Sequence, residues 1–278
     1  RILGTLQANG RIFIVNPNGV VFGQGASVDV GGLVASSLGI NNSDFMAGKL
    51  SFAAGSTQPG QVLVQPGVDI TAQSFVALLG NSVSNAGNIT AGKDPGADSR
   101  GIALVGADAA TIQLGSWNVS IDRAARDALV TNSGNLVIGQ SMEDGSIQLN
   151  AAGRNALMGA LLANTGTITN LSRGAGSDTS LVSTGRVSVG GEVKALGGTI
   201  AVRGREVELS GNVSVGDGQT VDSVSVEVGD ADTQRVTQTV DSVIAANSKM
   251  DANILMAAQK VLALSGALLA PGGEISLT

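Results

Sequence analysis

The side chains that most often perform catalysis or bind metals are scarce in this sequence. Its 278 residues include no Cys, no His and no Tyr, which excludes imidazole and thiol catalysis, disulfide frameworks and Cys/His zinc sites. Asp and Glu are scattered, and the compact charge groups are Glu143-Asp144 and Arg203-Gly204-Arg205-Glu206. We interpret these groups as a solvated turn and a salt bridge. The sequence therefore predicts no enzyme: no catalytic residues, no metal ligands, no cofactor, and no pocket that gathers two acids with a cation in catalytic geometry.

Trp117 is the one Trp of the chain, and two roles are open for it. Lone exposed aromatic rings stack on sugars in carbohydrate-binding proteins, so Trp117 is a weak candidate for a glycan contact. It could instead cover the protein core beside the loop at 122–126. We favour the second role.

Charge and hydropathy exclude two classes of partner. The net charge is −6 and the isoelectric point is about 4.6, whereas a nucleic-acid-binding protein needs a basic patch. No stretch of about 18 consecutive apolar residues predicts a transmembrane segment. The chain starts at Arg1 without an initiator Met or a basic leader. We therefore expect a fragment or a processed form, and the lack of Cys is compatible with an exported protein.

The secondary structure that positions the candidate residues is predicted by an internal repeat of the sequence. A short phrase recurs in which an apolar residue is followed by Asn, Gly and alternating β-forming residues. Its members carry Asn85, Asn132 and Asn164 in the turn, and Ile89, Leu136 and Ile168 after it. Short alternating strands separated by such turns bury an apolar face only when they stack on one another. The repeat therefore predicts a β-solenoid.

Several expectations follow from this solenoid. With about 20 residues per coil, residues 1–278 form a single β-helix of about ten to thirteen coils. The three Asn side chains form a ladder between stacked turns, the three apolar residues share one interior column, and Gly supplies positive-φ corners. Residues 230–264 contain no Gly or Pro and space Val236, Val240, Val243 and Ile244 as in a helix, which predicts a short helix or an excursion from the solenoid.

The most specific local pattern lies near the start of the chain. Two strand-like stretches flank Asn16-Pro17-Asn18-Gly19. Asn at the first position of a turn can accept a local backbone N–H, and Pro at the second position presets φ near −65°. The segment therefore predicts a tight turn between two strands.

With Leu6-Gln7-Ala8-Asn9-Gly10 before the turn and Phe22-Gly23 and 30–36 after it, the sequence resembles the two-partner-secretion domain of filamentous-haemagglutinin-type exoproteins. Residues 75–91 are similar to a further stretch of that family, so the resemblance covers residues 1–91. It implies an all-β fold, a right-handed parallel β-helix. The family's earlier Asn-Pro-Asn-Leu motif and capping strands are absent from this sequence, which implies that the chain begins inside the domain.

The resemblance also implies a function. Such domains are recognised by the POTRA domains of a cognate outer-membrane transporter, which exports the chain. We therefore expect a secreted or surface-exposed adhesin segment of a Gram-negative bacterium, with Asn16, Pro17, Asn18 and Gly19 as the secretion-motif turn. Three alternatives stay open: the stalk of a contact-dependent growth-inhibition toxin, a polysaccharide-binding rod, and a polysaccharide-degrading β-helix. Downstream sequence, glycan binding and release of reducing sugars would distinguish them.

Overall fold

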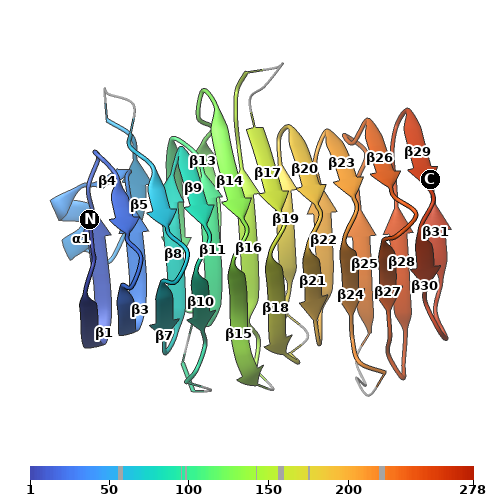
Figure 1. Cartoon of the computed structure of the whole chain (residues 1–278), viewed down its shortest axis with the longest axis horizontal. Coiled ribbons are helices and arrows are strands. Elements are labelled where there is room, and N and C mark those ends of the chain that lie inside the picture. Colours follow the sequence, from blue (N-terminus) through green and yellow to red (C-terminus); the bar gives the residue numbers. More distant parts are fainter. Residues whose placement is uncertain are drawn as a thin grey trace.

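The chain winds into a rod of stacked coils with its two termini at opposite ends (Figure 1). The computed structural model describes residues 1–55, 59–94, 96–97, 99–141, 143–155, 160–174, 176–218 and 223–278. Regular structure in this part of the chain is β-strand except for one short helix, α1 (Asn42–Met46), at the N-terminal end. The fold is a parallel β-helix.

Each complete coil contributes one strand to each of three sides of the rod, and equivalent strands of successive coils pair in parallel. The first side consists of β2 (Val20–Phe22), β6 (Val62–Val64), β9 (Ser82–Asn85), β14 (Ala128–Asn132), β17 (Ala160–Asn164), β20 (Arg186–Val189), β23 (Glu206–Leu209), β26 (Arg235–Gln238) and β29 (Val261–Leu264). The second side consists of β7 (Asp69–Ala72), β10 (Asn88–Ala91), β15 (Asn135–Ser141), β18 (Thr167–Ser172), β21 (Glu192–Ala195), β24 (Asn212–Val215), β27 (Val243–Ala246) and β30 (Ala267–Leu269).

The third side consists of β8 (Phe75–Gly80), β11 (Gly101–Gly106), β16 (Ser146–Ala151), β19 (Thr179–Ser183), β22 (Thr199–Arg203), β25 (Val224–Val228), β28 (Ala252–Met256) and β31 (Ile275–Leu277). The long strands β1 (Thr5–Val15) and β3 (Ser27–Ser36) at the N-terminal end run along both the second and the third side.

Alternate residues of each strand point into the rod and stack on their equivalents in the next coil. Leu136 is fully buried and lies in register between Ile89 and Ile168, which confirms the predicted column. Burying a side chain of this size stabilises the fold by about 1.5–3 kcal/mol. The full column on the second side is Leu6, Val28, Ile70, Ile89, Leu136, Ile168, Val193, Val213, Ile244 and Leu268.

Glycine supplies the predicted positive-φ corners at other turns, including Gly67, Gly92, Gly198 and Gly216, but not in the repeated phrase. Gly134 has no positive φ, but a Cβ added to it would lie 2.0 Å from the carbonyl oxygen of Gly87 in the preceding coil. Gly166 has the same relation to Gly134. Glycine is therefore required here because the stacked turns approach one another closely.

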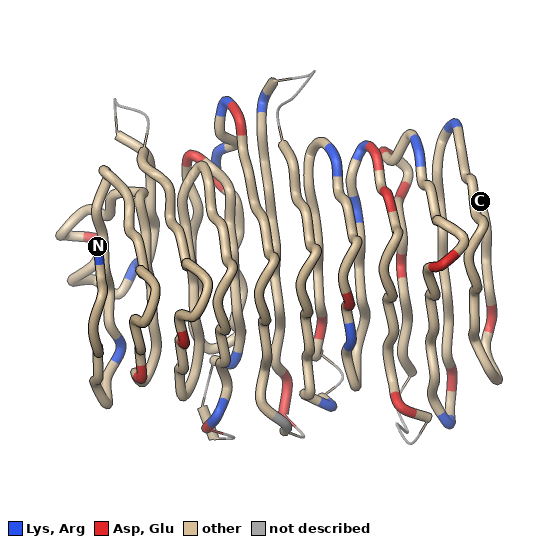
Figure 2. Tube along the Cα trace, viewed as in Figure 1, with Lys and Arg blue, Asp and Glu red and all other residues tan. Residues whose placement is uncertain are grey.

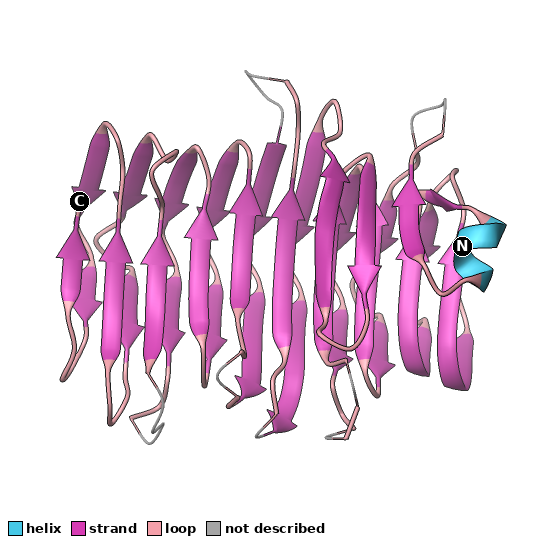
Figure 3. Cartoon of the chain, turned by 180° about the vertical axis from the view of Figure 1, so that it is seen from behind, coloured by secondary structure: helices cyan, strands magenta, loops and turns pink. Residues whose placement is uncertain are grey.

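A second layer covers the third side in the N-terminal half of the rod. An antiparallel outer sheet, β4 (Gly39–Ile40), β5 (Leu50–Ala53), β12 (Ala109–Gln113) and β13 (Asn118–Arg123), packs on β3, β8 and β11 through a separate apolar cluster. Viewed from behind, the outer sheet and α1 lie against this end of the rod (Figure 3). Strands β8 and β11 are consequently buried on both faces.

The segment 230–264 continues the solenoid, so the predicted helix or excursion is wrong. It contains β26, β27, β28 and β29, each paired in parallel with the preceding coil. Val236 and Ile244 are buried, whereas Val240 is 72% exposed because it lies in the turn between β26 and β27. Two short strands separated by this turn produce the helical spacing by coincidence.

Charged residues are sparse along the strands and lie chiefly near the turns (Figure 2). Within the described part of the chain, no helix has the length and apolar character needed to cross a membrane.

Candidate functional site

The Asn16–Gly19 segment forms a closed turn between β1 and β2. The Gly19 N–H donates to the Asn16 carbonyl oxygen at 2.8 Å, and the Asn18 N–H donates to Asn16 Oδ1 at 3.1 Å. Asn16, Pro17 and Asn18 are exposed. Since the Asn16 side chain satisfies a backbone donor within the turn, the turn keeps its shape while presenting these residues to solvent.

The following coil packs directly on this turn. The Gly60 N–H donates to the Pro17 carbonyl oxygen at 2.7 Å, and a Cβ added to Gly60 would lie 2.3 Å from the Asn18 carbonyl group. Gly19 has a φ of 104°, and a Cβ there would lie 2.7 Å from the Gln61 carbonyl oxygen. Glycine is therefore required at both positions, and the turn forms a fixed junction between two early coils.

Asn85, Asn132 and Asn164 form a buried ladder at the ends of β9, β14 and β17. Asn85 Nδ2 donates to Asn132 Oδ1, and Asn132 Nδ2 donates to Asn164 Oδ1, both at 2.8 Å. Each Nδ2 also donates to the carbonyl oxygen two residues later. All three side chains are at most 1% exposed. The ladder satisfies buried amides between coils that would otherwise destabilise the fold.

A second ladder, not predicted from the sequence, runs along the surface of the second side. Asn88 Nδ2 donates to Asp69 Oδ1 at 2.8 Å, Asn135 Nδ2 donates to Asn88 Oδ1 at 2.7 Å, and Thr167 Oγ1 donates to Asn135 Oδ1 at 2.5 Å. The repeated phrase contained the necessary indication, because Asn88 and Asn135 both follow the turn glycine directly.

Trp117 lies beneath the outer sheet rather than on an open surface. Its indole is 7% exposed and stacks on Phe75, with ring centroids 5.0 Å apart and an interplanar angle of 27°. The indole occupies the space above Gly101, where an added Cβ would lie 1.7 Å from Trp117 Nε1. This burial supports the core-covering role over stacking on a sugar.

A cavity of about 580 Å³ beside the hairpin of β12 and β13 brings together residues that lie far apart in the sequence. Arg100, Glu143 and Asp144 all line it, so this cavity brings together two acids and a cation. That no pocket does so in catalytic geometry stays a prediction. Arg100 and Asp144 are each engaged with backbone groups: Arg100 Nη2 donates to two carbonyl oxygens, and Asp144 Oδ1 accepts from the Gly176 N–H at 2.9 Å. Among the described residues, no group of three or more acidic side chains is arranged to hold a metal ion.

The fold defines the class of the protein: a parallel β-helix. The family model described as "TPS secretion domain" matches residues 1–172, which is more than half of the chain. The chain therefore belongs to the two-partner secretion family and carries the secretion domain of a secreted exoprotein. The match extends well beyond residues 1–91, on which the resemblance in the sequence rests.

Two curated relatives from Haemophilus influenzae are named heme/hemopexin-binding protein. One is 32% identical over 163 residues, covering 56% of this chain and 17% of the relative. The other is 32% identical over 97 residues, covering 29% and 10%. The chain thus spans less than a fifth of the length of these relatives.

Among solved structures, the HMW1 secretion domain from Haemophilus influenzae is similar with a TM-score of 0.65. It is 17% identical, and the match covers 93% of this chain and 80% of that one. This likeness supports the parallel β-helix as the fold.

Proposed function

We propose that this chain directs export of a surface adhesin through a cognate outer-membrane transporter, whose periplasmic POTRA domains recognise its early coils. Membership of the two-partner secretion family supports this role, since such a domain implies a transporter partner. Residues beyond the early coils then form the first part of the adhesin's rod. The chain acts by binding, not by catalysis.

The stacking pattern suits export of an unfolded chain. Each strand within the rod pairs with the equivalent strands of the coils before and after it, as β15 does with β10 and β18, whereas strands at the two ends pair on one side. Stability in such a solenoid is close to a sum of nearest-neighbour terms, so folding can propagate coil by coil. A chain that emerges N-terminus first can therefore add each coil to a finished one, and this folding opposes return of the chain to the transporter.

The exposed Asn16–Gly19 turn is the observation that carries the recognition part of the proposal. Its backbone is held by Asn16 and by the next coil, yet Asn16, Pro17 and Asn18 remain exposed. An amide pair on a fixed turn gives a partner a defined set of hydrogen-bonding groups at low entropic cost.

The test is secreted yield against periplasmic retention for an Asn16→Ala/Asn18→Ala variant of the full-length exoprotein. We expect reduced export while the purified domain keeps its fold. Asn212→Ala/Asn253→Ala is a control, because each of these side chains accepts one backbone N–H, as Asn16 does, but lies far along the rod. Normal export of the first variant would leave the turn with a purely architectural role.

The names of the curated relatives concern heme and hemopexin, and we propose no such activity for this chain. His, Cys and Tyr, three of the side chains that commonly hold haem iron, are absent from its sequence.

A further inference from the structure

A groove runs along the flank of the outer sheet where the apolar cover of the third side ends. The 580 Å³ cavity at Arg100 and a neighbouring cavity of about 520 Å³ share Trp117, Ser146 and Gly176 as lining residues. The tip of the β12–β13 hairpin forms one wall, and the outward side chains of β16, β19 and β22 contribute to the floor. We call this feature the flank groove.

Arg100 is the buried cation of the flank groove. The residue is 3% exposed, and its Nη2 donates to the carbonyl oxygens of Gly92 and Gly139 at 2.8 and 2.9 Å. Its Nε and Nη1 are buried and find no hydrogen-bond partner in the structure as described. Burial lowers the pKa of this guanidinium, and the carboxylates of Glu143 and Asp94 act in the opposite direction. A buried cation with unused donors favours binding of an anion.

Trp117 also lines this cavity and carries a second unused donor. Its Nε1 is buried and has no hydrogen-bond partner within the described structure, although buried indole N–H groups usually find one. The unused groups of Arg100 and Trp117 are all N–H donors. Their complement is a group that only accepts hydrogen bonds and carries negative charge, which describes a carboxylate.

The same cavity also presents hydrogen-bond acceptors to a ligand. Glu143 and Asp144 are exposed and line the cavity, where ionised carboxylates accept hydrogen bonds and repel a bare anion. Gly96, Gly115, Gly145 and Gly176 also line the cavity and leave room beside these side chains. A ligand that carries both a carboxylate and hydroxyl groups satisfies both the donors and the acceptors of the cavity, and a uronic acid has this chemistry.

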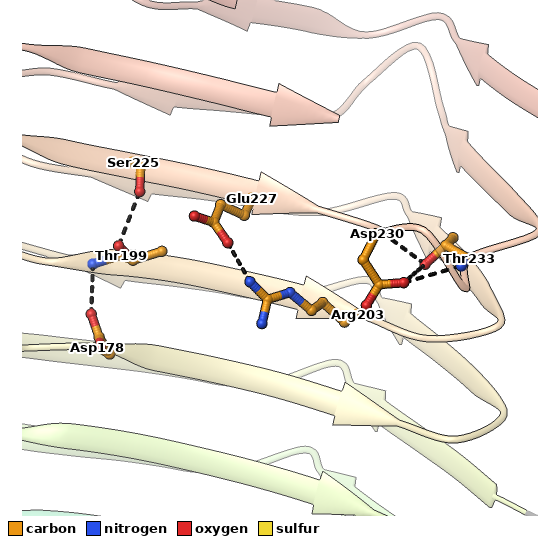
Figure 4. Close-up of polar contacts among 7 residues, drawn as sticks. All are labelled: Asp178, Thr199, Arg203, Ser225, Glu227, Asp230 and Thr233. Atoms are coloured by element: carbon orange, nitrogen blue, oxygen red, sulfur yellow. Dashed lines mark hydrogen bonds and ion pairs between the residues drawn. The ribbon is translucent and has the colours of Figure 1, made fainter. Parts of the chain in front are cut away.

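The remainder of the flank groove continues as a polar surface across successive coils. Gln148 Nε2 donates to Asn118 Oδ1 at 2.9 Å, which links the floor to the hairpin wall. Farther along, Thr199 Oγ1 lies 3.0 Å from Ser225 Oγ, and Arg203 pairs with Glu227 (Figure 4). With strands about 4.8 Å apart, the floor from β16 to β22 spans about 10 Å. A chain-like ligand can lie across these strands.

We propose that the flank groove binds an acidic oligosaccharide, with one uronate carboxylate on Arg100 and Trp117 and its hydroxyl groups on Glu143 and Asp144. Neighbouring sugar units lie over Gln148 and Thr199. The inference is independent of the secretion role, and its failure would leave the export experiment unaffected.

The fluorescence of Trp117 reports on the cavity, because Trp117 is the single Trp of a chain without Tyr. Titration of the purified chain with trigalacturonate should change the Trp emission in a saturable way, while maltotriose and sodium acetate should give no saturable change over the same range. An equal response to maltotriose would overturn the carboxylate assignment, and an equal response to acetate would overturn the sugar assignment. No response to trigalacturonate would overturn the proposal.

Two variants test where the ligand binds. Ser146→Tyr introduces a bulky ring where the two cavities meet and should weaken trigalacturonate binding at least tenfold, whereas Ser188→Tyr, an equivalent outward position on the first side in β20, should leave it unchanged. Arg100→Lys keeps the charge but loses the planar donor set, so binding should weaken about tenfold. Unchanged binding in a folded Ser146→Tyr or Arg100→Lys variant would refute the location. Should Arg100→Lys fail to fold, Ser146→Tyr decides alone.

Discussion

Replacing the middle amide of the Asn ladder should cost more stability than replacing an end amide. Asn132 accepts from Asn85 Nδ2 and donates to Asn164 Oδ1. It also donates to the Gly134 carbonyl oxygen at 3.3 Å. Asn132→Ala therefore removes both links of the ladder. Asn164→Ala removes one link, because the next residue in this register is Val189.

The magnitudes follow from the number of groups left without a partner. A net hydrogen bond contributes about 1 kcal/mol, and a buried polar atom left unsatisfied costs about 1–3 kcal/mol. Asn132→Ala loses two links and leaves Asn164 Oδ1 without a hydrogen-bond partner. We therefore expect the free energy of unfolding to fall by about 3–5 kcal/mol. Asn164→Ala loses one link, and Asn132 Nδ2 keeps its bond to the Gly134 carbonyl oxygen, so we expect about 1.5–3 kcal/mol.

A triple replacement of the ladder by Val separates this explanation from simple loss of volume. Val64 and Val189 already occupy the register positions before and after the ladder, so the rod accommodates Val there. The triple variant removes donors and acceptors together and leaves no ladder amide without a partner. Its loss in free energy of unfolding should therefore be clearly smaller than the sum of the losses of the three single Asn→Val variants. Urea unfolding followed by circular dichroism measures all of these variants. An Asn132→Ala variant no less stable than Asn164→Ala, or an additive triple variant, would contradict the reasoning.

Three further predictions concern single positions. Leu136→Asp places a charge in the interior column and should prevent folding or cost more than about 4 kcal/mol in urea unfolding, whereas Leu129→Asp at a 37% exposed outward site should cost less than about 1 kcal/mol. Gly134→Ala should lower the melting temperature strongly, since its Cβ would lie 2.0 Å from a backbone oxygen, while Gly4→Ala, with nothing within 4 Å, should not. Asn16→Ala loses one local side-chain acceptor and should cost about 1 kcal/mol in thermal unfolding of the isolated domain; a loss above about 3 kcal/mol would show a larger structural role.

The solenoid could be predicted because a stacked fold repeats its chemistry at equivalent positions. Each coil must offer a branched apolar residue at the site of Leu136 and a small residue at the site of Gly134, so both constraints recur in the sequence as one phrase. The coils at 230–264 escaped this reasoning because their turns use other chemistry. Between β25 and β26, Asp230 Oδ1 accepts from the backbone N–H and the hydroxyl of Thr233 (Figure 4). Between β26 and β27, Ser242 stands at the register position of Gly211, and its hydroxyl donates to the Thr239 carbonyl oxygen.

The outer sheet was also missed, although the sequence contains an indication of it. Residues 75–79 and 102–105 are unbroken apolar runs, whereas Ser146–Ala151 alternates between buried and half-buried residues. An unbroken run in a short strand indicates burial on both faces. The flank groove had no such indication, because Arg100, Trp117 and Glu143 come from one coil, a hairpin and the next coil. Only the stacked structure brings them together.

The rod has an N-terminal part that carries additional elements and a C-terminal part of regular coils. This difference bears on how a transporter recognises the chain. Coils from β17 onward resemble one another, since each presents short strands with the same inward columns. A surface that repeats along the rod offers a partner many equivalent binding positions. Such a surface therefore cannot fix where the partner binds. Features that occur once in the described chain, namely α1, the outer sheet and the Asn16–Gly19 turn, lie within residues 1–172, the segment that the family model matches. We infer that recognition depends on these non-repeating features, and that the coils beyond them contribute folding energy and length.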